Sequence, residues 1–183
     1  KEPDEVVYRC ENIACPDQVK GRLIHFSSRG AMDIEGMGEM LVEQLVDKGW
    51  VHDIGDIYEL AFEVLNNLER MGKKSAQNIL NGIESSKNRS FADLLFGLGI
   101  RHVGNVAAET LANEFGDMDT LLNSSKEDIE NIHEIGSIMA ESIFRTLHEP
   151  HTLKLIERLK KSSVTMKSEK KKVAGNLPLS GKS

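Results

Sequence analysis

Apolar residues recur along this chain in a fixed relation to four single glycines. Four residues after each glycine comes a small or apolar side chain, and seven residues after it comes a large aliphatic one. Positions that lie three and four apart share one face of an α-helix. Each glycine is therefore predicted to open a helix with an apolar face. The glycines are Gly38, Gly72, Gly104 and Gly136, followed by Val42, Ala76, Ala108 and Ala140 at the first position and by Leu45, Ile79, Leu111 and Ile143 at the second.

The residues before each glycine repeat as well. An aliphatic residue lies four positions before the glycine, and an aliphatic residue or methionine lies directly before it, in residues 34–38, 68–72, 100–104 and 132–136. Apolar residues at helical spacing over 53–68 predict a helix before the second segment. Before the fourth, Ser124 with Glu127 and Ser125 with Asp128 form two overlapping capping-box patterns. The predicted fold class is mainly α, with four tandem helix-hairpin-helix repeats.

These hairpins have a chemistry of their own. Glycine tolerates positive φ, so the chain can turn sharply, and the next helix then starts with unpaired N–H groups and the positive end of its dipole. Such a hairpin can hold a DNA backbone phosphate without reading base sequence. The candidate DNA-binding residues are the hairpin glycines and the cations near them: Arg29, Gly36, Gly38, Arg70, Gly72, Lys73, Lys74, Arg101, His102, Gly104 and Gly136.

The same repeat can also serve only to pack helices. Only the first hairpin keeps two glycines, and the other three have Arg70, His102 and Glu134 where the first has Gly36. Because Glu134 would bring a like charge to a phosphate, the fourth hairpin is expected to be mainly structural. Trp50, the only tryptophan, is expected to be a partly buried lid on the first repeat rather than a residue that stacks on bases.

Composition narrows the class of protein. The 183 residues are 39% hydrophobic but only 5% aromatic, which predicts an aliphatic core. No apolar run approaches the roughly 18 residues that span a bilayer. The charged first residues resemble no signal peptide, and two cysteines are too few for a disulfide-stapled scaffold, so a cytoplasmic location is expected.

Charge is distributed unevenly. The net charge is −6, yet residues 150–183 hold nine basic and two acidic residues, and the remainder holds 14 basic and 27 acidic ones. An acidic body does not bind nucleic acid by bulk charge. Any such binding must rely on local geometry and a few well-placed cations.

Two cysteines lie near the N-terminus. Cys10 and Cys15 form a Cys-x4-Cys pair, which can supply half of a tetrahedral zinc site. His25 is the nearest further candidate ligand. On the pair alone, two ordinary reduced cysteines are the favoured interpretation, because two ligands do not hold a structural zinc.

Several segments together resemble the bacterial NAD-dependent DNA ligases. Arg9-Cys10, Asn12, Cys15-Pro16 and Gln18 are similar to the second half of the family's four-cysteine zinc finger. Residues 25–38, 68–76 and 98–104 look like the first three hairpins of its helix-hairpin-helix domain, and residues 178–182 look like the start of its BRCT domain. The order of parts matches from end to end. The resemblance implies a zinc-finger half at 1–22, a helix-hairpin-helix domain with four hairpins at 23–166, a linker at 167–176 and the start of a BRCT domain at 177–183.

The resemblance also implies a division of labour. The family seals nicks in duplex DNA during replication and repair, and its adenylated lysine lies in a Lys-x-Asp-Gly motif that this chain lacks. We therefore expect no catalytic residue here and no activity of the chain alone. NAD and magnesium would serve upstream domains, and a structural zinc would use Cys10, Cys15 and two further ligands upstream. The expected partners are nicked double-stranded DNA and the adenylation and oligonucleotide-binding domains of the same protein, with the protein a monomer and no membrane involved.

Two other classes of function stay open at this point. Repair nucleases and junction-binding proteins use the same hairpins as DNA-binding modules. A protein-interaction scaffold could use the repeats only for helix packing, and the acidic body mildly favours that interpretation.

Overall fold

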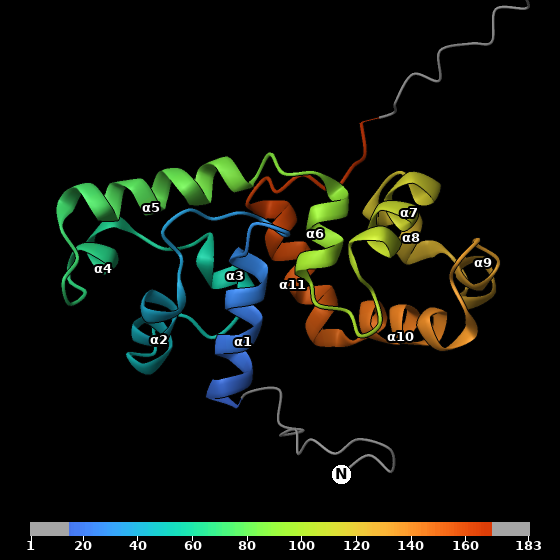
Figure 1. The fold of residues 1–183 in the computed structure, drawn as a ribbon, viewed down its shortest axis with the longest axis horizontal. Helices are drawn as coiled ribbons and strands as arrows, with labels where there is room; N and C mark the ends of the chain where they lie inside the picture. Colours follow the sequence, from blue (N-terminus) through green and yellow to red (C-terminus); the bar gives the residue numbers. More distant parts are fainter. Residues whose placement is uncertain (1–14, 170–183) are drawn as a thin grey trace, which may run out of the picture.

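The computed structural model describes residues 15–169, and these residues form an elongated helical body that contains no β-strand. In Figure 1, α2, α4 and α5 lie at one end and α7, α8 and α9 at the other, with α1, α3, α6 and α11 between them. The helices are α1 (Pro16–Ser27), α2 (Glu39–Asp47), α3 (Ile54–Ile57), α4 (Phe62–Asn66), α5 (Lys73–Ser86), α6 (Phe91–Gly97), α7 (Asn105–Phe115), α8 (Met118–Asn123), α9 (Lys126–Glu130), α10 (Ser137–His148) and α11 (Pro150–Lys161). The mainly helical prediction is confirmed.

Four helix-hairpin-helix units form most of this body. The helix pairs α1–α2, α4–α5, α6–α7 and α9–α10 each enclose one predicted hairpin, and the two helices of each pair pack on each other. All eight positions four and seven residues after the hairpin glycines are buried, as the spacing predicted. Burial of these stripes drives each helix onto its partner.

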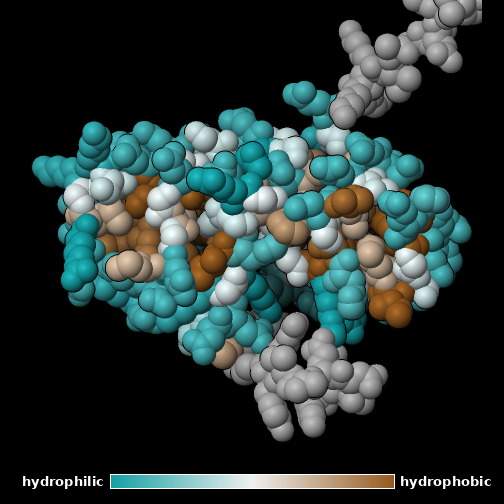
Figure 2. All heavy atoms as spheres, in the orientation of Figure 1, coloured by the Kyte–Doolittle hydropathy of each residue, from teal (hydrophilic) through white to brown (hydrophobic). Residues whose placement is uncertain are grey.

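The core is aliphatic, with two phenylalanines at its centre. Phe26 and Phe91 are almost fully buried among leucine, isoleucine, valine and methionine side chains. At Gly97 of α6 an added Cβ would lie 3.1 Å from the Phe26 ring, so α1 and α6 approach closely there. Figure 2 shows hydrophilic residues over most of one face, with hydrophobic residues visible between them. No helix in the described range is long and apolar enough to cross a membrane.

The helix predicted over 53–68 is interrupted. It forms two short helices, α3 and α4, because these pack on different partners: α3 contacts α1 and α11, while α4 contacts α5. The half-buried side chain of Tyr58, between them, packs edge-on against Phe26 and forms a hydrogen bond of 3.1 Å with the Ser86 hydroxyl. The prediction of one continuous helix is wrong for this reason.

Side-chain caps start several of the other helices. Ser125 and Asp128 form the predicted capping box of α9, whereas Ser124 ends α8 and donates to the Leu121 carbonyl. Asp117 caps α8 by accepting a hydrogen bond from the Thr120 amide.

Trp50 is 53% exposed, so the expectation of a partly buried lid on the first repeat is wrong.

The last described segment runs back across the body. The Thr165 amide donates a hydrogen bond to the Lys87 carbonyl in the turn after α5. At the α7–α8 junction, the Met166 carbonyl accepts from the Met118 amide, and the Ser168 amide donates to the Gly116 carbonyl. The segment therefore ties the first half of the chain to the second. The interdomain linker and the BRCT start, predicted for 167–176 and 177–183, lie almost entirely outside the described residues. The boundary predicted after residue 22 falls inside α1.

Candidate nucleic-acid interface

The four hairpins share one backbone conformation. In each, the amide before the last glycine donates to the carbonyl three residues earlier: Met37 to Ile34 at 3.2 Å, Met71 to Leu68 at 3.2 Å, Val103 to Ile100 at 3.0 Å and Ile135 to Ile132 at 3.0 Å. The residue in the middle of each turn is left-handed: Gly36 (φ +85°), Arg70 (+58°), His102 (+70°) and Glu134 (+72°). Glycine adopts this conformation more readily than other residues, but the turn does not require it, since three other residue types adopt it here.

The final glycine of each hairpin is the N-cap of the helix that follows. Gly38, Gly72, Gly104 and Gly136 have φ between −92° and −84° with extended ψ, a conformation open to any residue. A Cβ added at any of the four meets no atom within 4 Å. Nothing inside the described body therefore requires glycine at these positions.

These glycines leave the first turn of each helix uncapped. No side chain accepts a hydrogen bond from the N-terminal amides of α2, α5, α7 or α10. By contrast, Asp53, Ser90, Asp117 and Ser125 cap helices that do not follow a hairpin. Each of the four hairpins thus has open space beside backbone amides that no side chain caps, and a small anion could bind there.

Gly36 has a different role. An added Cβ would lie 2.9 Å from Ile79 Cγ1, so Gly36 lets the first hairpin pack closely on α5. Gly82 of α5 makes the matching approach, since its Cβ would lie 3.0 Å from the Glu35 carbonyl oxygen. Of the two glycines in this hairpin, Gly38 is the one that faces open space.

A groove of about 1000 Å³ lies between the first hairpin and α5. Arg29, Gly36 and Gly38, three predicted site residues, all line it. The opposite wall is formed by Asn78, Asn81, Gly82 and Ser85 of α5. Sequence reasoning missed these polar residues, although their spacing of three and four places them on one helix face and could have revealed them.

Cations gather at the second and third hairpins. Arg70, Lys73 and Lys74 are exposed around Gly72, and none of them forms an ion pair within residues 15–169. Arg101 and His102 are exposed before Gly104, and the Arg101 carbonyl accepts a hydrogen bond of 2.8 Å from Ser142 of α10. Glu134 is exposed at the fourth hairpin, where the turn holds His133 but no lysine or arginine.

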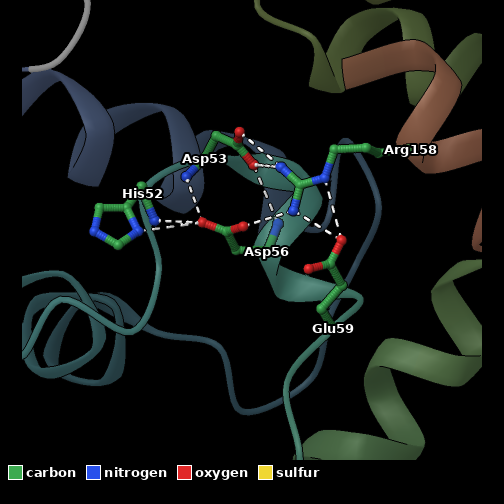
Figure 3. A network of polar contacts seen from close by, with 5 residues as sticks. All are labelled: His52, Asp53, Asp56, Glu59 and Arg158. Carbon is green, nitrogen blue, oxygen red and sulfur yellow. Dashed lines mark hydrogen bonds and ion pairs between the residues drawn. The ribbon is translucent and has the colours of Figure 1, made fainter. Parts of the chain in front are cut away.

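An ion-pair network fixes how the two halves of the chain are joined. Figure 3 shows Arg158 of α11 between Asp53, Asp56 and Glu59, which lie in or beside α3. Its guanidinium lies 2.8 Å from Asp53 Oδ1, 2.6 Å from Asp56 Oδ1 and 2.8 Å from Glu59 Oε1. The network joins residues about a hundred positions apart, and it holds α11, which also packs on α10, against α3, which lies between the first and second hairpins.

The charges in this network support one another. Burial by itself would raise the pKa of Asp56, but hydrogen bonds from Arg158 and from the backbone amides of His52 and Asp53 outweigh it and lower that pKa. The hydrogen bond to Asp56 likewise raises the pKa of Arg158, which stays cationic.

The zinc prediction is only partly covered by the structure. Cys15 is the half-buried N-cap of α1, and Cys10 lies outside the described residues. Thiolates in a Cys-x4-Cys pair are suitable zinc donors, but within 15–169 no three His, Cys, Asp or Glu side chains come together as a metal site. The zinc site stays a prediction.

Comparison with known proteins identifies the repeat. Residues 29–85 match a family model described as a SAM-like helix-hairpin-helix tandem, and residues 93–156 match a helix-hairpin-helix motif model. The chain is 52% identical over 164 residues to a DNA ligase of Natranaerobius thermophilus and 50% identical over 163 residues to one of Methylacidiphilum infernorum. These alignments cover 90% and 89% of the chain but only 25% and 24% of the relatives. The chain thus spans about a quarter of the length of the curated relatives it matches.

Proposed function

We propose that this chain, which corresponds to the helix-hairpin-helix portion of a DNA ligase, holds the backbone of nicked duplex DNA without reading its sequence. One observation carries the proposal: the four N-cap glycines face open space, and no packing within the described body requires glycine at these positions. The amides behind them are not capped by any side chain. A phosphate would find hydrogen-bond donors, a helix dipole and no Cβ in its way.

Nicks occur at any sequence, so a ligase must hold DNA through groups that every sequence shares. Backbone phosphates are such groups, and contacts to them position a protein without specifying bases. The first and second hairpins form one pair along the chain, and the third and fourth form another. Joined through α1, α6 and α11, these two pairs would place phosphate sites on both strands across the minor groove. Arg29, Arg70, Lys73, Lys74, Arg101 and His102 would add positive charge at the first three hairpins.

The bond-forming chemistry would belong to other parts of a longer protein. We infer that the parent enzyme takes AMP from NAD on a lysine, passes it to the 5′-phosphate of the nick and joins the strands with the help of magnesium. This chain lacks the Lys-x-Asp-Gly motif for that lysine. Its own contribution would be DNA affinity and placement, with a structural zinc that uses Cys10 and Cys15 joining it to the preceding domain.

The test compares DNA binding with helix capping. Replacing Gly72 or Gly104 with Ser adds a side chain that caps the helix, which raises stability by about 0.3 kcal/mol. The same side chain occupies the space and the donors of the proposed phosphate site, so affinity for a nicked duplex falls about tenfold per hairpin. Fluorescence anisotropy measures the affinity, and thermal unfolding measures the stability.

A matched control is Ala61→Ser, at the uncapped start of α4, which does not follow a hairpin. It raises stability by about 1 kcal/mol and leaves DNA affinity unchanged. For the unchanged chain, if about four phosphates are neutralised, the logarithm of affinity falls with the logarithm of salt at a slope of about −3.6. Preference for branched over nicked DNA would instead indicate a junction-binding or nuclease module. Unchanged DNA affinity in both glycine variants would contradict the phosphate sites.

A further inference from the structure

Three exposed aliphatic side chains occupy the same position in three repeats. Met40, Val106 and Ile138 each lie two residues after the final hairpin glycine, in the first turn of α2, α7 and α10. They are 68%, 69% and 73% exposed, although the residues two positions further along each helix are buried. The second repeat has Lys74 at this position.

This common position sets the three side chains apart from the scattered apolar residues of an ordinary surface. Within the described range, five large hydrophobic residues are markedly exposed, and three of them are these. Single exposed apolar residues are normal on protein surfaces, but a repeated position has a repeated cause. Packing is not that cause, because these side chains project away from the core that fixes the helices.

The neighbouring glycine indicates what the cause is. Next to each of these side chains lies a site with open space and unpaired amides, suited to an anion. A ligand that matches both must carry a negative group and an apolar group within one helical turn. The sugar-phosphate backbone of DNA has this character, since each phosphate is followed by a deoxyribose whose 2′ carbon bears only hydrogen.

We propose that Met40, Val106 and Ile138 pack on deoxyribose rings beside the phosphates held by their own hairpins, and that they select DNA over RNA. This inference rests on the proposed function. In an RNA duplex the wide minor groove displays 2′-hydroxyls, which an aliphatic contact would leave without a hydrogen-bond partner. In the second repeat Lys74 would reach a phosphate instead.

The two kinds of contact differ in their response to salt. Phosphate contacts by cations release counterions, so their loss changes the slope of log affinity against log salt by about 0.9 per contact. Apolar packing on a sugar releases no counterion. Loss of such packing lowers affinity equally at all salt concentrations and leaves the slope unchanged.

The experiment replaces Val106 and Ile138 with Thr, singly and together, in the whole chain. Anisotropy titrations use a nicked DNA duplex and a nicked RNA duplex of the same sequence, each over a series of salt concentrations. We expect each change to lower affinity for DNA about threefold to tenfold with an unchanged slope. Affinity for RNA changes less, so the preference for DNA shrinks.

Two further variants calibrate the result. Leu153→Thr changes an exposed aliphatic residue of α11 that lies outside the repeated position, and it leaves DNA affinity unchanged. Lys74→Met makes the slope less steep instead. Circular dichroism confirms that each variant is folded.

Each alternative outcome has a distinct form. If the unchanged chain binds DNA with a steep salt slope but the Thr variants bind equally well, the sugar contact is refuted and the proposed function stands. If the Thr variants lose DNA and RNA affinity equally, the selection of DNA is refuted. If they instead lose self-association in sedimentation, the patch contacts a second copy and the inference is wrong. An unchanged chain that binds no DNA refutes the proposed function itself.

Discussion

Replacing Arg158 with Ala tests how the two halves of the chain are held together. The guanidinium is the only group within residues 15–169 that contacts Asp53, Asp56 and Glu59 at once. Its removal deletes the ion pairs between α11 and the α3 region, and it leaves three carboxylates close to one another without a neutralising cation. The expected result is a less stable fold with unchanged helices.

The magnitude follows from the burial of each partner. The side chains of Asp53 and Asp56 are 23% and 21% exposed, so each charged hydrogen bond contributes about 1 kcal/mol, below the 1.5 to 3 of fully buried cases. Glu59 is 60% exposed and contributes about 0.5 kcal/mol or less. We expect a total loss of about 2 to 3 kcal/mol, a large fraction of the stability of a domain this size.

The assay is urea unfolding followed by circular dichroism, at neutral pH and at low and high salt. Because the network is only partly exposed, salt reduces the loss but does not abolish it. The pH dependence has a definite sign. The pKa of Asp56 is lower in the folded than in the unfolded chain, so its contribution is complete above the ordinary value of about 3.9 and is lost as the pH falls through the folded pKa. A loss below about 0.5 kcal/mol at neutral pH would refute this account.

Gly55 supplies a second, independent check on the same network. A Cβ added at Gly55 would lie 2.8 Å from Arg158 Cζ. Gly55→Ala in the unchanged chain must displace the guanidinium, so it destabilises the fold. In the Arg158→Ala background the space is free, and the greater helix propensity of alanine raises stability by up to about 1 kcal/mol. An equal effect in both backgrounds would show that the guanidinium is not held in place.

Three further predictions concern packing, titration and metal. Gly82→Ala forces a Cβ against the Glu35 carbonyl and lowers stability by about 1 to 3 kcal/mol, whereas Gly21→Ala in α1, where the space is open, raises it by about 0.5 kcal/mol; urea unfolding compares the two. Burial raises the pKa of Tyr58 from 10.0 to about 12, so stability falls as the pH rises through this range, and an ultraviolet titration of Tyr58→Phe lacks the late phenol transition. A longer protein with two further cysteines before this chain binds one structural zinc, and a metal analysis that finds none contradicts the finger.

The hairpins and the buried faces of the helices that follow them could be predicted from sequence, because both depend on residues only a few positions apart. The buried faces of α2, α5, α7 and α10 follow from positions four and seven residues after each hairpin glycine. The contact between Arg158 and Asp53 could not be predicted, since it joins residues 105 positions apart. The break between α3 and α4 escaped for the same reason, because it depends on which distant helices each one packs against.

The candidate site divides along the same line. Glycines and cations within a hairpin were found because they are neighbours in sequence. Asn78 and Asn81 were missed because they reach the first hairpin only through the packing of α5 at Gly82. The role of Gly36 in that packing was hidden too, since sequence alone does not separate a glycine that faces a ligand from one that faces a helix.

The left-handed position in each hairpin separates the shape of a site from its charge. Gly36, Arg70, His102 and Glu134 adopt the same turn with four different side chains. At the last three of these positions the turn already carries a side chain, so substitution there can alter the attraction for an anion without rebuilding the backbone, whereas Gly36 has Ile79 too close for an added Cβ. The proposed grip on DNA would then be graded along the array, strongest at the second hairpin and weakest at the fourth. If the proposed function holds, a duplex gripped this way would detach first at the fourth hairpin.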